Sequence, residues 1–316
     1  MAYKVFIDGR AGTTGLRIAG RLAERADIEL LEIPDAERKD LNARLDLAKK
    51  ADITILCLPD EEAREIVAHA DPEVRLIDCS TAHRTADGWV YGMPEIVDVK
   101  KGEVRIANPG CHATGFILAV RPLVGIVLDG DAQLCCFSIT GYSGGGKAMI
   151  AEYEAADRSR GDALSAPRRY ALSQEHKHIP EMQKYAGLGI APVFSPVVCD
   201  YYSGMLVCVA LPRGAFRKTV SVNEVYELLA ARYERCPLVK VCKPREEESG
   251  EVVVKDLDAA AFRDRDDIEI FVTGKDDRIE IVSRFDNLGK GASGAAIQNM
   301  NLVLGLPETA GLVTGK

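Results

Sequence analysis

The chain of 316 residues contains no uninterrupted apolar stretch long enough to cross a membrane. It also has no charged segment followed by an apolar one at its start, so we expect neither a spanning helix nor a secretory leader. Positive charge is in deficit, because 40 lysines and arginines face 48 aspartates and glutamates, for a formal net charge of −8. This deficit argues against a general nucleic-acid binder. A local basic pocket for a small anionic substrate remains compatible with it.

No two of the nine cysteines have the C-x-x-C spacing, which argues against a zinc knuckle and a dithiol redox motif. Their number is odd, and most lie in apolar strand-like runs such as 55–58 and 206–209. We therefore expect free thiols, a reducing compartment and a cytoplasmic location. The sequence has neither an internal repeat nor a low-complexity tract.

The first third of the chain alternates strand-like and helix-like patterns, which predicts a Rossmann-type doubly wound sheet of the α/β class. The expected strands cover residues 5–7, 28–33, 53–58, 74–78 and 104–107. The expected helices carry apolar residues at helical spacing, namely Leu16, Ala19, Leu22 and Ala23, then Ala63, Ile66, Val67 and Ala70.

Beyond about residue 130, strand-like runs follow one another, which predicts an α+β domain with a mostly antiparallel sheet. These runs cover residues 133–140, 192–199, 205–211, 268–273 and 278–283. A helical pattern at 222–233 interrupts them, and Ile297, Met300 and Leu304 mark a last amphipathic helix. The charge-rich stretches 157–166 and 243–250 are predicted to be surface loops.

A glycine-rich turn follows the first expected strand and contains Gly9, Gly12, Thr13, Thr14 and Gly15. Its spacing is G-x-x-G-x-x-G rather than G-x-G-x-x-G, but the physical use of the glycines is the same. They let the backbone turn sharply and approach a pyrophosphate, which rests on the helix N-terminus. An ordinary glycine-rich turn is the alternative. The alternating pattern around it favours a dinucleotide.

The end of the second expected strand bears on the choice of dinucleotide. Glu32 and Asp35 would suit the ribose 2′-hydroxyl of NAD, whereas Arg38 and Lys39 would suit the 2′-phosphate of NADP. The sequence leaves that choice open and leans towards NADP(H).

Cys111 is the strongest candidate for a nucleophile. It follows a strand-like run and precedes Ala113, Phe116, Ile117 and Val120 at helical spacing, so we expect it at the first turn of a helix. The unpaired backbone N–H groups there, together with the helix dipole, favour the thiolate over the thiol. The alternative is that Cys111 is a small buried apolar residue, as most free cysteines are.

His176 and His178 are two of only five histidines and come just before Pro180, which is well placed to open a helix. In extended chain, residues two apart face the same way. A pair of exposed histidines in a charged loop is the alternative, but beside a nucleophilic Cys111 one of them becomes a candidate general acid/base. A metal site would need a third ligand, which no spacing here supplies, so we expect no metal.

Two further segments could bind anions. Arg84 follows the expected strand 74–78 at its carboxyl end and could grip a phosphate or a carboxylate, although it could equally be a solvated surface arginine. Residues 141–147 include three consecutive glycines and a lysine, which could form an anion-binding nest or a mobile loop. They lack the G-x-x-x-x-G-K-[ST] pattern, which excludes an ATP-binding P-loop.

Taken together, several segments resemble the N-acetyl-γ-glutamyl-phosphate reductases, the arginine-biosynthetic family among the semialdehyde dehydrogenases. They span nearly the whole chain in the family's order: residues 12–15, Y-G-M-P-E at 91–95, N-P-G-C at 108–111, S-G-G-G-K at 143–147, H-K-H-I-P-E at 176–181 and 286–301, which begins D-N-L-G-K-G-A-S-G. The chain looks like the family's compact subgroup. It departs from the family pattern at His112 and Ala113, where tyrosine and proline are common, and residues 80–84 match only loosely.

The resemblance implies an NADPH-dependent acyl-phosphate reductase acting through a thioester on Cys111, with His176 or His178 as the acid/base. It implies that Ser143, Gly144 and Asn287 join the glycine turn and Arg38 around the cofactor. Substrate contacts would come from Arg84, Asn108, Ser143 and Gly144. The implied domains are a dinucleotide-binding domain (1–112), a catalytic and oligomerisation domain (113–286) and a C-terminal helix returning to the first domain near the nicotinamide (287–316). We expect a homodimer or homotetramer and a small acyl phosphate as substrate, with no nucleic-acid or membrane partner.

Rival functions remain at this point. Aspartate-semialdehyde dehydrogenase performs the same chemistry on a smaller acyl phosphate, but the H-x-H-x-P-E and C-terminal segments favour the arginine pathway. A relative acting on an acyl group carried by an acidic protein would need a basic docking face, which an acidic chain does not favour. From another class, the chain could be a non-catalytic NADP(H) sensor.

Overall fold

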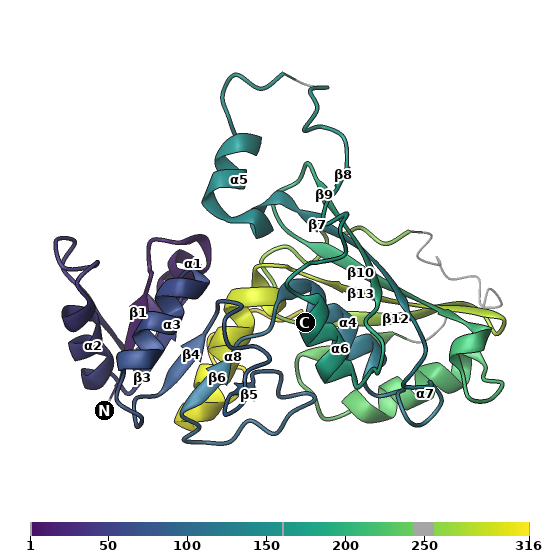
Figure 1. Cartoon of the computed structure of the whole chain (residues 1–316), viewed down its shortest axis with the longest axis horizontal. Helices are drawn as coiled ribbons and strands as arrows, with labels where there is room; N and C mark the ends of the chain where they lie inside the picture. Colours follow the sequence, from purple (N-terminus) through teal and green to yellow (C-terminus); the bar gives the residue numbers. More distant parts are fainter. Residues whose placement is uncertain (1, 160, 243–255, 316) are drawn as a thin grey trace. The chain divides into compact units, whose positions relative to one another are not determined.

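The computed structural model describes residues 2–159, 161–242 and 256–315 (Figure 1). The predicted loop 243–250 lies outside them. The chain forms two compact units, Met1–Gly110 with Ala292–Leu312, and Cys111–Gly291 with Val313–Lys316. The chain passes between the units at 110/111, 291/292 and 312/313, and the helix that begins at Cys111 packs on the sheet of the second unit. Within the described ranges, no helix has the length and apolar character needed to cross a membrane.

The first unit contains a six-stranded sheet in which every neighbouring pair is parallel. Its order is β2 (Ile28–Leu31), β1 (Tyr3–Asp8), β3 (Ile53–Leu56), β4 (Leu76–Asp78), β6 (Arg105–Ala107) and β5 (Val90–Tyr91). The helices of this unit are α1 (Thr13–Ala23), α2 (Leu41–Lys50), α3 (Asp60–His69) and α8 (Gly294–Leu304). The order reverses between β1 and β3, which is the switch point where such sheets bind ligands.

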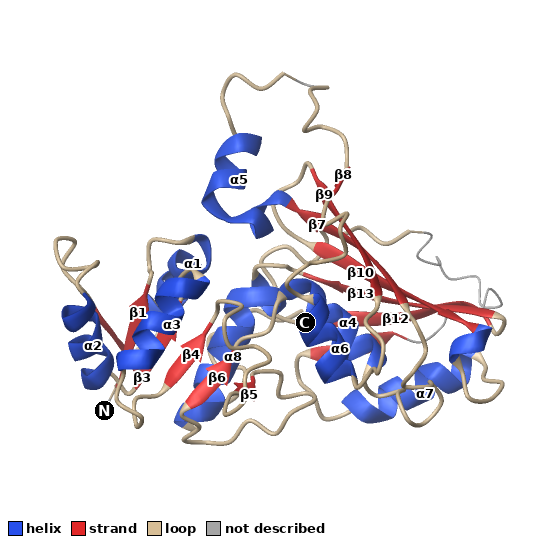
Figure 2. Cartoon of the chain, viewed as in Figure 1, coloured by secondary structure: helices blue, strands red, loops and turns tan. Residues whose placement is uncertain are grey.

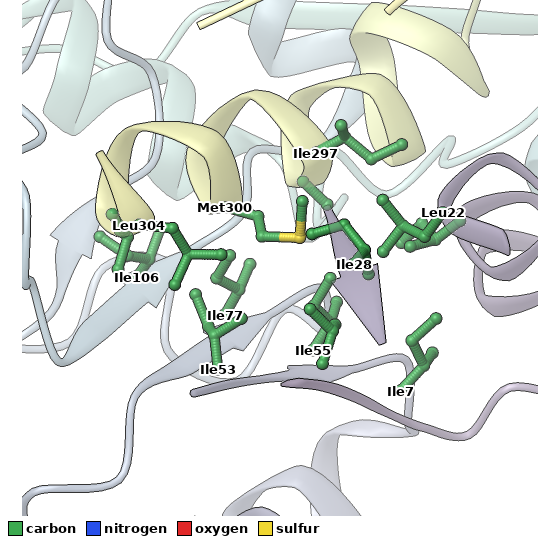
Figure 3. Close-up of a cluster of buried hydrophobic side chains, with 14 of the residues drawn as sticks. Ile7, Leu22, Ile28, Ile53, Ile55, Ile77, Ile106, Ile297, Met300 and Leu304 are labelled. Carbon is green, nitrogen blue, oxygen red and sulfur yellow. The ribbon is translucent and has the colours of Figure 1, made fainter. Parts of the chain in front are cut away.

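Alternating strand residues bury both faces of this sheet. Ile53, Ile55 and Ile77 pack with α1 and α8, whereas Leu56 and Leu76 join the cluster that contains residues of α2 and α3. Figure 3 shows Ile297, Met300 and Leu304 of α8 among the strand isoleucines. The prediction that the strand at 53–58 is buried on both faces is confirmed for Ile53–Leu56.

Two helices differ from their predicted patterns. The last helix was expected to be amphipathic, but all of α8 except Leu302 is buried, so it has no polar face towards solvent. In α1, Leu16 is 55% exposed although its spacing placed it in the core; Ile18 fills that role instead. Burial here is decided by neighbours far along the chain, which spacing alone does not reveal.

Helix α2 was not predicted from the sequence. The inner side of this helix carries Arg44 together with Leu41, Leu45 and Ala48. Arg44 Nε donates to both carboxylate oxygens of Asp8 at 3.1 and 2.9 Å. Asp40 caps the helix by accepting from Ala43 N. The charged Arg44 in the middle of this short apolar pattern weakens its helical signal, which explains the omission. The short strands β5, β8 and β11 were missed as well.

The second unit contains a seven-stranded mixed sheet (Figure 2). Its order is β11 (Val239–Cys242), β12 (Ile268–Lys275), β13 (Arg278–Phe285), β10 (Met205–Pro212), β7 (Cys135–Gly141), β9 (Val193–Cys199) and β8 (Arg168–Arg169). Four of the six neighbouring pairs are antiparallel; β11–β12 and β7–β9 are parallel. The predicted mostly antiparallel sheet is therefore confirmed.

Helices cover one face of this second sheet. They are α4 (Cys111–Val120), α6 (Ile179–Ala186) and α7 (Val222–Tyr233), of which α4 contacts β10 and β13 and α7 contacts β11 and β12 (Figure 2). A further helix, α5 (Gly146–Tyr153), follows the 3₁₀ turn η1 (Tyr142–Gly145); η2 (Arg213–Ala215) and the π-helical turn η4 (Gly289–Ser293) complete the elements. Along β7, Cys136 and Ser138 are buried whereas Phe137 is 45% exposed, so the opposite face presents apolar side chains.

Candidate active site

Cys111 is the first residue of α4 and is only partly buried. The predicted position at a helix start is therefore confirmed. Backbone N–H groups in the first turn of a helix have no intrahelical acceptor, so their positive ends are available to an anion at Cys111. A thiolate or an oxyanion formed next to it is stabilised by the same groups.

The D-N-L-G-K-G segment at residues 286–291 packs against Cys111. A Cβ atom at Gly291 would lie 2.7 Å from Cys111 Cβ, so only glycine fits there without a shift. Asp286 sets the local path, because its carbonyl accepts from both Gly289 N and Gly291 N and its carboxylate accepts from Leu288 N at 3.0 Å. This contact explains physically why a glycine-rich segment near the end of the chain accompanies the cysteine.

His178, one of the predicted pair of histidines, lies near Cys111. One of its ring nitrogens lies within 4.8 Å of Cys111 Sγ, and the ring is buried. Its Nε2 is 3.9 Å from the buried carboxylate of Glu181. His176 supports it, since its Nδ1 accepts from His178 N at 3.1 Å and the two rings meet edge to face at 4.6 Å.

The two rings come together by a different route from the one predicted. His178 has helical backbone angles at the N-cap of α6, and Ile179 N donates to His176 O, so the chain turns instead of running extended. Pro180 lies in the first turn of α6, as expected.

His112, for which no role was predicted from the sequence, lies close to Cys111, His176 and His178. The side chain is buried, with Nδ1 2.8 Å from Ser138 Oγ and Nε2 2.8 Å from Tyr170 Oη. Burial, and secondarily the nearby His176, lower the pKa of His112 to about 3. His112 is therefore neutral at physiological pH and acts there as a hydrogen-bonding group, not as a cation.

Tyr170, also missed, connects this group to the cysteine. Burial raises the pKa of its phenol, and the charge of Cys111 adds to the effect. The only available signal for His112 was its place directly after the cysteine. Tyr170 directly follows the short strand β8, 59 residues from Cys111 in sequence, and no local pattern could have found it.

The fold supplies the third potential metal ligand that the sequence spacing lacked. Among the described residues, Cys111, His112 and His178 offer one sulfur and two nitrogens that all lie within 4.8 Å of one another. The expectation that no third ligand is available was therefore wrong, because helix α4 and the turn before α6 contribute from distant parts of the sequence.

The glycine turn of the first unit has the shape that a pyrophosphate site needs. Gly9 has φ of +81°, and a Cβ there would lie 2.3 Å from Cys57 O, at the end of β3. Gly12 is the N-cap of α1, so the amides of Thr13, Thr14 and Gly15 open the helix. A Cβ at Gly15 would lie 2.7 Å from Gly9 O. The hydroxyl of Thr13 is buried without a hydrogen-bond partner in the described structure, which fits a ligand group beside it.

The groups after β2 lie on an exposed turn. Glu32 pairs with Arg10 at 2.6 Å, so its carboxylate is already engaged by a residue of the glycine turn. Arg38 is 56% exposed at its side chain and lies 3.9 Å from Asp35. An exposed arginine on this turn is available to a 2′-phosphate, whereas one carboxylate oxygen of Glu32 is already engaged by Arg10.

Arg84 and Asn108 are brought together, but through the main chain. Arg84 Nε donates to Asn108 O at 2.9 Å, and Nη2 donates to Cys79 O at 3.3 Å. The Asn108 side chain donates to Ala292 O at 3.0 Å. Arg84 is buried, so the alternative of a solvated surface arginine is wrong. The contacts make Arg84 a brace for the chain that leads to Cys111, and its substrate role stays a prediction.

Ser143, Gly144 and Asn287 also meet, within the second unit. Asn287 Nδ2 donates to Ser143 Oγ at 3.1 Å, and Asn287 Oδ1 accepts from Gly204 N at 2.8 Å. A Cβ at Gly144 would lie 3.4 Å from Asn287 Nδ2. These bonds join the S-G-G-G-K and D-N-L-G segments; their cofactor and substrate roles stay predictions.

Comparisons with known proteins agree with this geometry. Residues 4–101 match the NAD-binding domain of the semialdehyde dehydrogenases and residues 111–287 match their dimerisation domain. The N-acetyl-gamma-glutamyl-phosphate reductase 2 of Nostoc sp. is 42% identical, over 98% of this chain and 99% of its own length. The corresponding reductase of Sinorhizobium medicae is 43% identical, over 96% and 99%. The chain belongs to the N-acetyl-γ-glutamyl-phosphate reductase family of the semialdehyde dehydrogenases.

The solved structures extend the likeness of fold beyond this family. Aspartate semialdehyde dehydrogenase from Francisella tularensis has a TM-score of 0.70 at 16% identity, covering 96% of this chain and all of its own. Aspartate semialdehyde dehydrogenase II from Vibrio cholerae, complexed with ASA, has a TM-score of 0.67 at 18% identity and covers 96% and 98%. The predicted family and fold class are confirmed, and the chain is an oxidoreductase of the semialdehyde dehydrogenase type.

Proposed function

We propose that the protein reduces N-acetyl-γ-glutamyl phosphate with NADPH to N-acetylglutamate 5-semialdehyde and phosphate. The observation that carries the proposal is the placement of Cys111 at the start of α4 with a His178 ring nitrogen within 4.8 Å of its sulfur. The geometry by itself does not specify the acyl group of the substrate. We infer it from full-length relatives named N-acetyl-gamma-glutamyl-phosphate reductase, which are 42–43% identical to this chain.

The glycine turn is the proposed seat of NADP(H). The amides of Thr13 and Thr14 at the start of α1 and the buried Thr13 hydroxyl are suited to the pyrophosphate, and Arg38 to the 2′-phosphate. When bound, the nicotinamide supplies a hydride. The engagement of Glu32 by Arg10 is what favours NADP(H) over NAD(H) in this proposal.

Cys111 performs the covalent steps. Its thiolate attacks the acyl carbon, a C–S bond forms, and the bond from that carbon to the phosphate oxygen breaks, with phosphate leaving. Hydride addition to the resulting thioester carbon gives a thiohemiacetal. Its C–S bond then breaks to release the aldehyde and regenerate the thiolate. First-turn amides of α4 stabilise the oxyanion of each tetrahedral species.

His178 is the proposed acid/base. It accepts the thiol proton before attack, and it donates a proton to the oxygen of the thiohemiacetal and later removes it as the carbonyl forms. Glu181, 3.9 Å from Nε2, favours the protonated ring that forms in between. His176 positions this ring by accepting from His178 N.

The reaction is tested in reverse, where N-acetylglutamate semialdehyde, phosphate and NADP⁺ should give NADPH. Cys111→Ser should abolish this formation, and mass spectrometry of acid-quenched wild-type enzyme should find one acyl group on Cys111. A preference for aspartate semialdehyde would overturn the substrate. Unchanged activity in Cys111→Ser would overturn the mechanism, and NADPH binding without any reduction would favour a sensor.

The histidine assignment has a separate test. His178→Asn should lose the ionisation that governs kcat/KM near neutrality, whereas His176→Asn should lower kcat but keep that ionisation. The reverse pattern of pH profiles would assign the acid/base to His176. Arg84→Lys tests whether Arg84 contacts the substrate or only braces the chain before Cys111. The quantity measured is the change in KM for phosphate.

The family's dimerisation domain supports an oligomer, and we propose a homodimer or homotetramer built on the open face of the second sheet. Phe137 of β7 is 45% exposed there, and it pairs in register with Cys208 of β10, which pairs with Val282 of β13. Cys208 is partly buried and Val282 is buried within the chain, so the exposed Phe137 is the apolar group on this face that is suited to contact a second copy. We also propose a cytoplasmic location, because the nine cysteines are odd in number, include no C-x-x-C pair and lie mostly in apolar strand-like runs of the sequence.

A further inference from the structure

We propose that Cys111, His112 and His178 form a binding site for a soft divalent cation of the Zn²⁺ class, which would block the nucleophile reversibly. Their ligand atoms are one sulfur and two imidazole nitrogens, all within 4.8 Å of one another. This donor set suits Zn²⁺, Co²⁺ and Cd²⁺, whereas Mg²⁺ and Ca²⁺ require oxygen ligands.

The spacing of the ligand atoms is close to that of a tetrahedral centre. Zn–S bonds of about 2.3 Å and Zn–N bonds of about 2.0–2.1 Å place ligand atoms roughly 3.5 Å apart. The observed upper limit of 4.8 Å therefore requires closure by at most about 1.3 Å, within the reach of side-chain rotations. Because Cys111 is partly exposed, water can take the fourth position.

His112 already has the outer hydrogen bond that metal-ligating histidines usually have, and His178 has a carboxylate nearby that could provide one. The His112 Nδ1 atom lies 2.8 Å from Ser138 Oγ, which fixes the ring and directs Nε2 as the ligand. His178 Nε2 lies 3.9 Å from Glu181, which leaves Nδ1 as the ligand of that ring. Such outer contacts fix the ring orientation and its tautomer.

One contact opposes the metal. Tyr170 Oη lies 2.8 Å from His112 Nε2, and the cation must displace it. Binding also releases the Cys111 thiol proton to solvent. These two costs predict an affinity below that of a closed structural zinc site, as expected for a reversible inhibitory site.

The inhibitory effect rests on the proposed function, because it follows from Cys111 being the nucleophile; the binding itself does not. Co²⁺ is the probe for binding, added to the chelator-treated full chain without substrates. We expect one Co²⁺ per chain with a thiolate-to-cobalt charge-transfer band, displaced by Zn²⁺.

Matched variants assign the ligands. Cys111→Ser should lose the charge-transfer band, and His112→Gln should weaken Co²⁺ binding by at least about 10-fold. Ser138→Ala leaves the ring in place and should weaken binding by about 10-fold through the lost outer contact. His69→Gln, at an exposed histidine of α3, should leave binding unchanged. Equal affinity in wild type, His112→Gln and Ser138→Ala would overturn the site, as would absence of the band in the wild type.

Activity assays separate the two proposals. Zn²⁺ should inhibit the wild type, EDTA should restore it, and His112→Gln should require at least about 10-fold more Zn²⁺ for the same fractional inhibition. The Co²⁺ band in a protein with no reductase activity would support the site and overturn the proposed function. An active enzyme without the band and without Zn²⁺ inhibition would overturn the site alone.

Discussion

His112 should make the stability of the protein fall as the pH is lowered. The ring is 3% exposed, and burial lowers its pKa from 6.5 to about 3. Between these values the unfolded chain binds a proton that the folded chain does not, so the free energy of unfolding rises with pH. The contribution is fully present above the unfolded pKa and is lost progressively as the pH falls from 6.5 towards 3.

The magnitude follows from this difference. Between about pH 7.5 and about pH 5, protonation of an unfolded histidine stabilises the unfolded chain by about 2 kcal/mol, at 1.36 kcal/mol per pKa unit. The folded ring stays neutral throughout this interval, because its pKa of about 3 lies well below it. The expected change of about 2 kcal/mol therefore depends little on how far the pKa of the folded His112 is lowered.

The perturbation is His112→Gln, which keeps hydrogen-bonding groups towards Ser138 and Tyr170 but does not titrate. Urea unfolding of both proteins is followed by circular dichroism at the two pH values, at one protein concentration and with a chelator present. The stability difference between wild type and variant should shift by about 2 kcal/mol against the wild type at the lower pH. A difference that is the same at both pH values would refute the buried, neutral histidine.

Three further predictions concern other parts of the chain. Gly9→Ala should destabilise the first unit by about 2–4 kcal/mol, because Gly9 has φ of +81° and a Cβ there would meet Cys57 O. Gly12→Ala, with φ of −71° and 3.4 Å of clearance, should cost less than about 1 kcal/mol and mainly weaken NADPH binding. Equal melting temperatures of the two variants would contradict this. Phe137→Arg should weaken oligomer association by about 10-fold or more in sedimentation experiments. Leu172→Arg, at an even more exposed apolar site outside the sheet, serves as the control. Iodoacetamide at neutral pH should modify Cys208 about 10³-fold more slowly than an ordinary thiol, because burial raises its pKa to about 12; peptide mapping that finds comparable rates would count against it.

Much of the fold could be predicted because its signals are local. The buried run at Ile53–Leu56, the glycine turn after β1 and the helix begun by Cys111 each depend on a few consecutive residues. The predictions failed where partners distant in sequence decide the structure. Helix α2 is held by the Arg44–Asp8 ion pair, and α8 is buried on nearly all of its residues. A single-sequence pattern records neither kind of contact.

The same division applies to the site. Contiguous residues of a particular chemistry were enough to predict the candidate nucleophile Cys111, the histidine pair and the glycine turn, and to identify the family. Packing of distant elements joined His112 to Tyr170 and brought ligand atoms of Cys111, His112 and His178 within 4.8 Å of one another. The physical reason is that proximity and burial, which set hydrogen bonds and pKa values, arise when separate elements pack together. The position of Cys111 at a helix start follows from local sequence, whereas the side chains around it come from distant segments that the fold brings together.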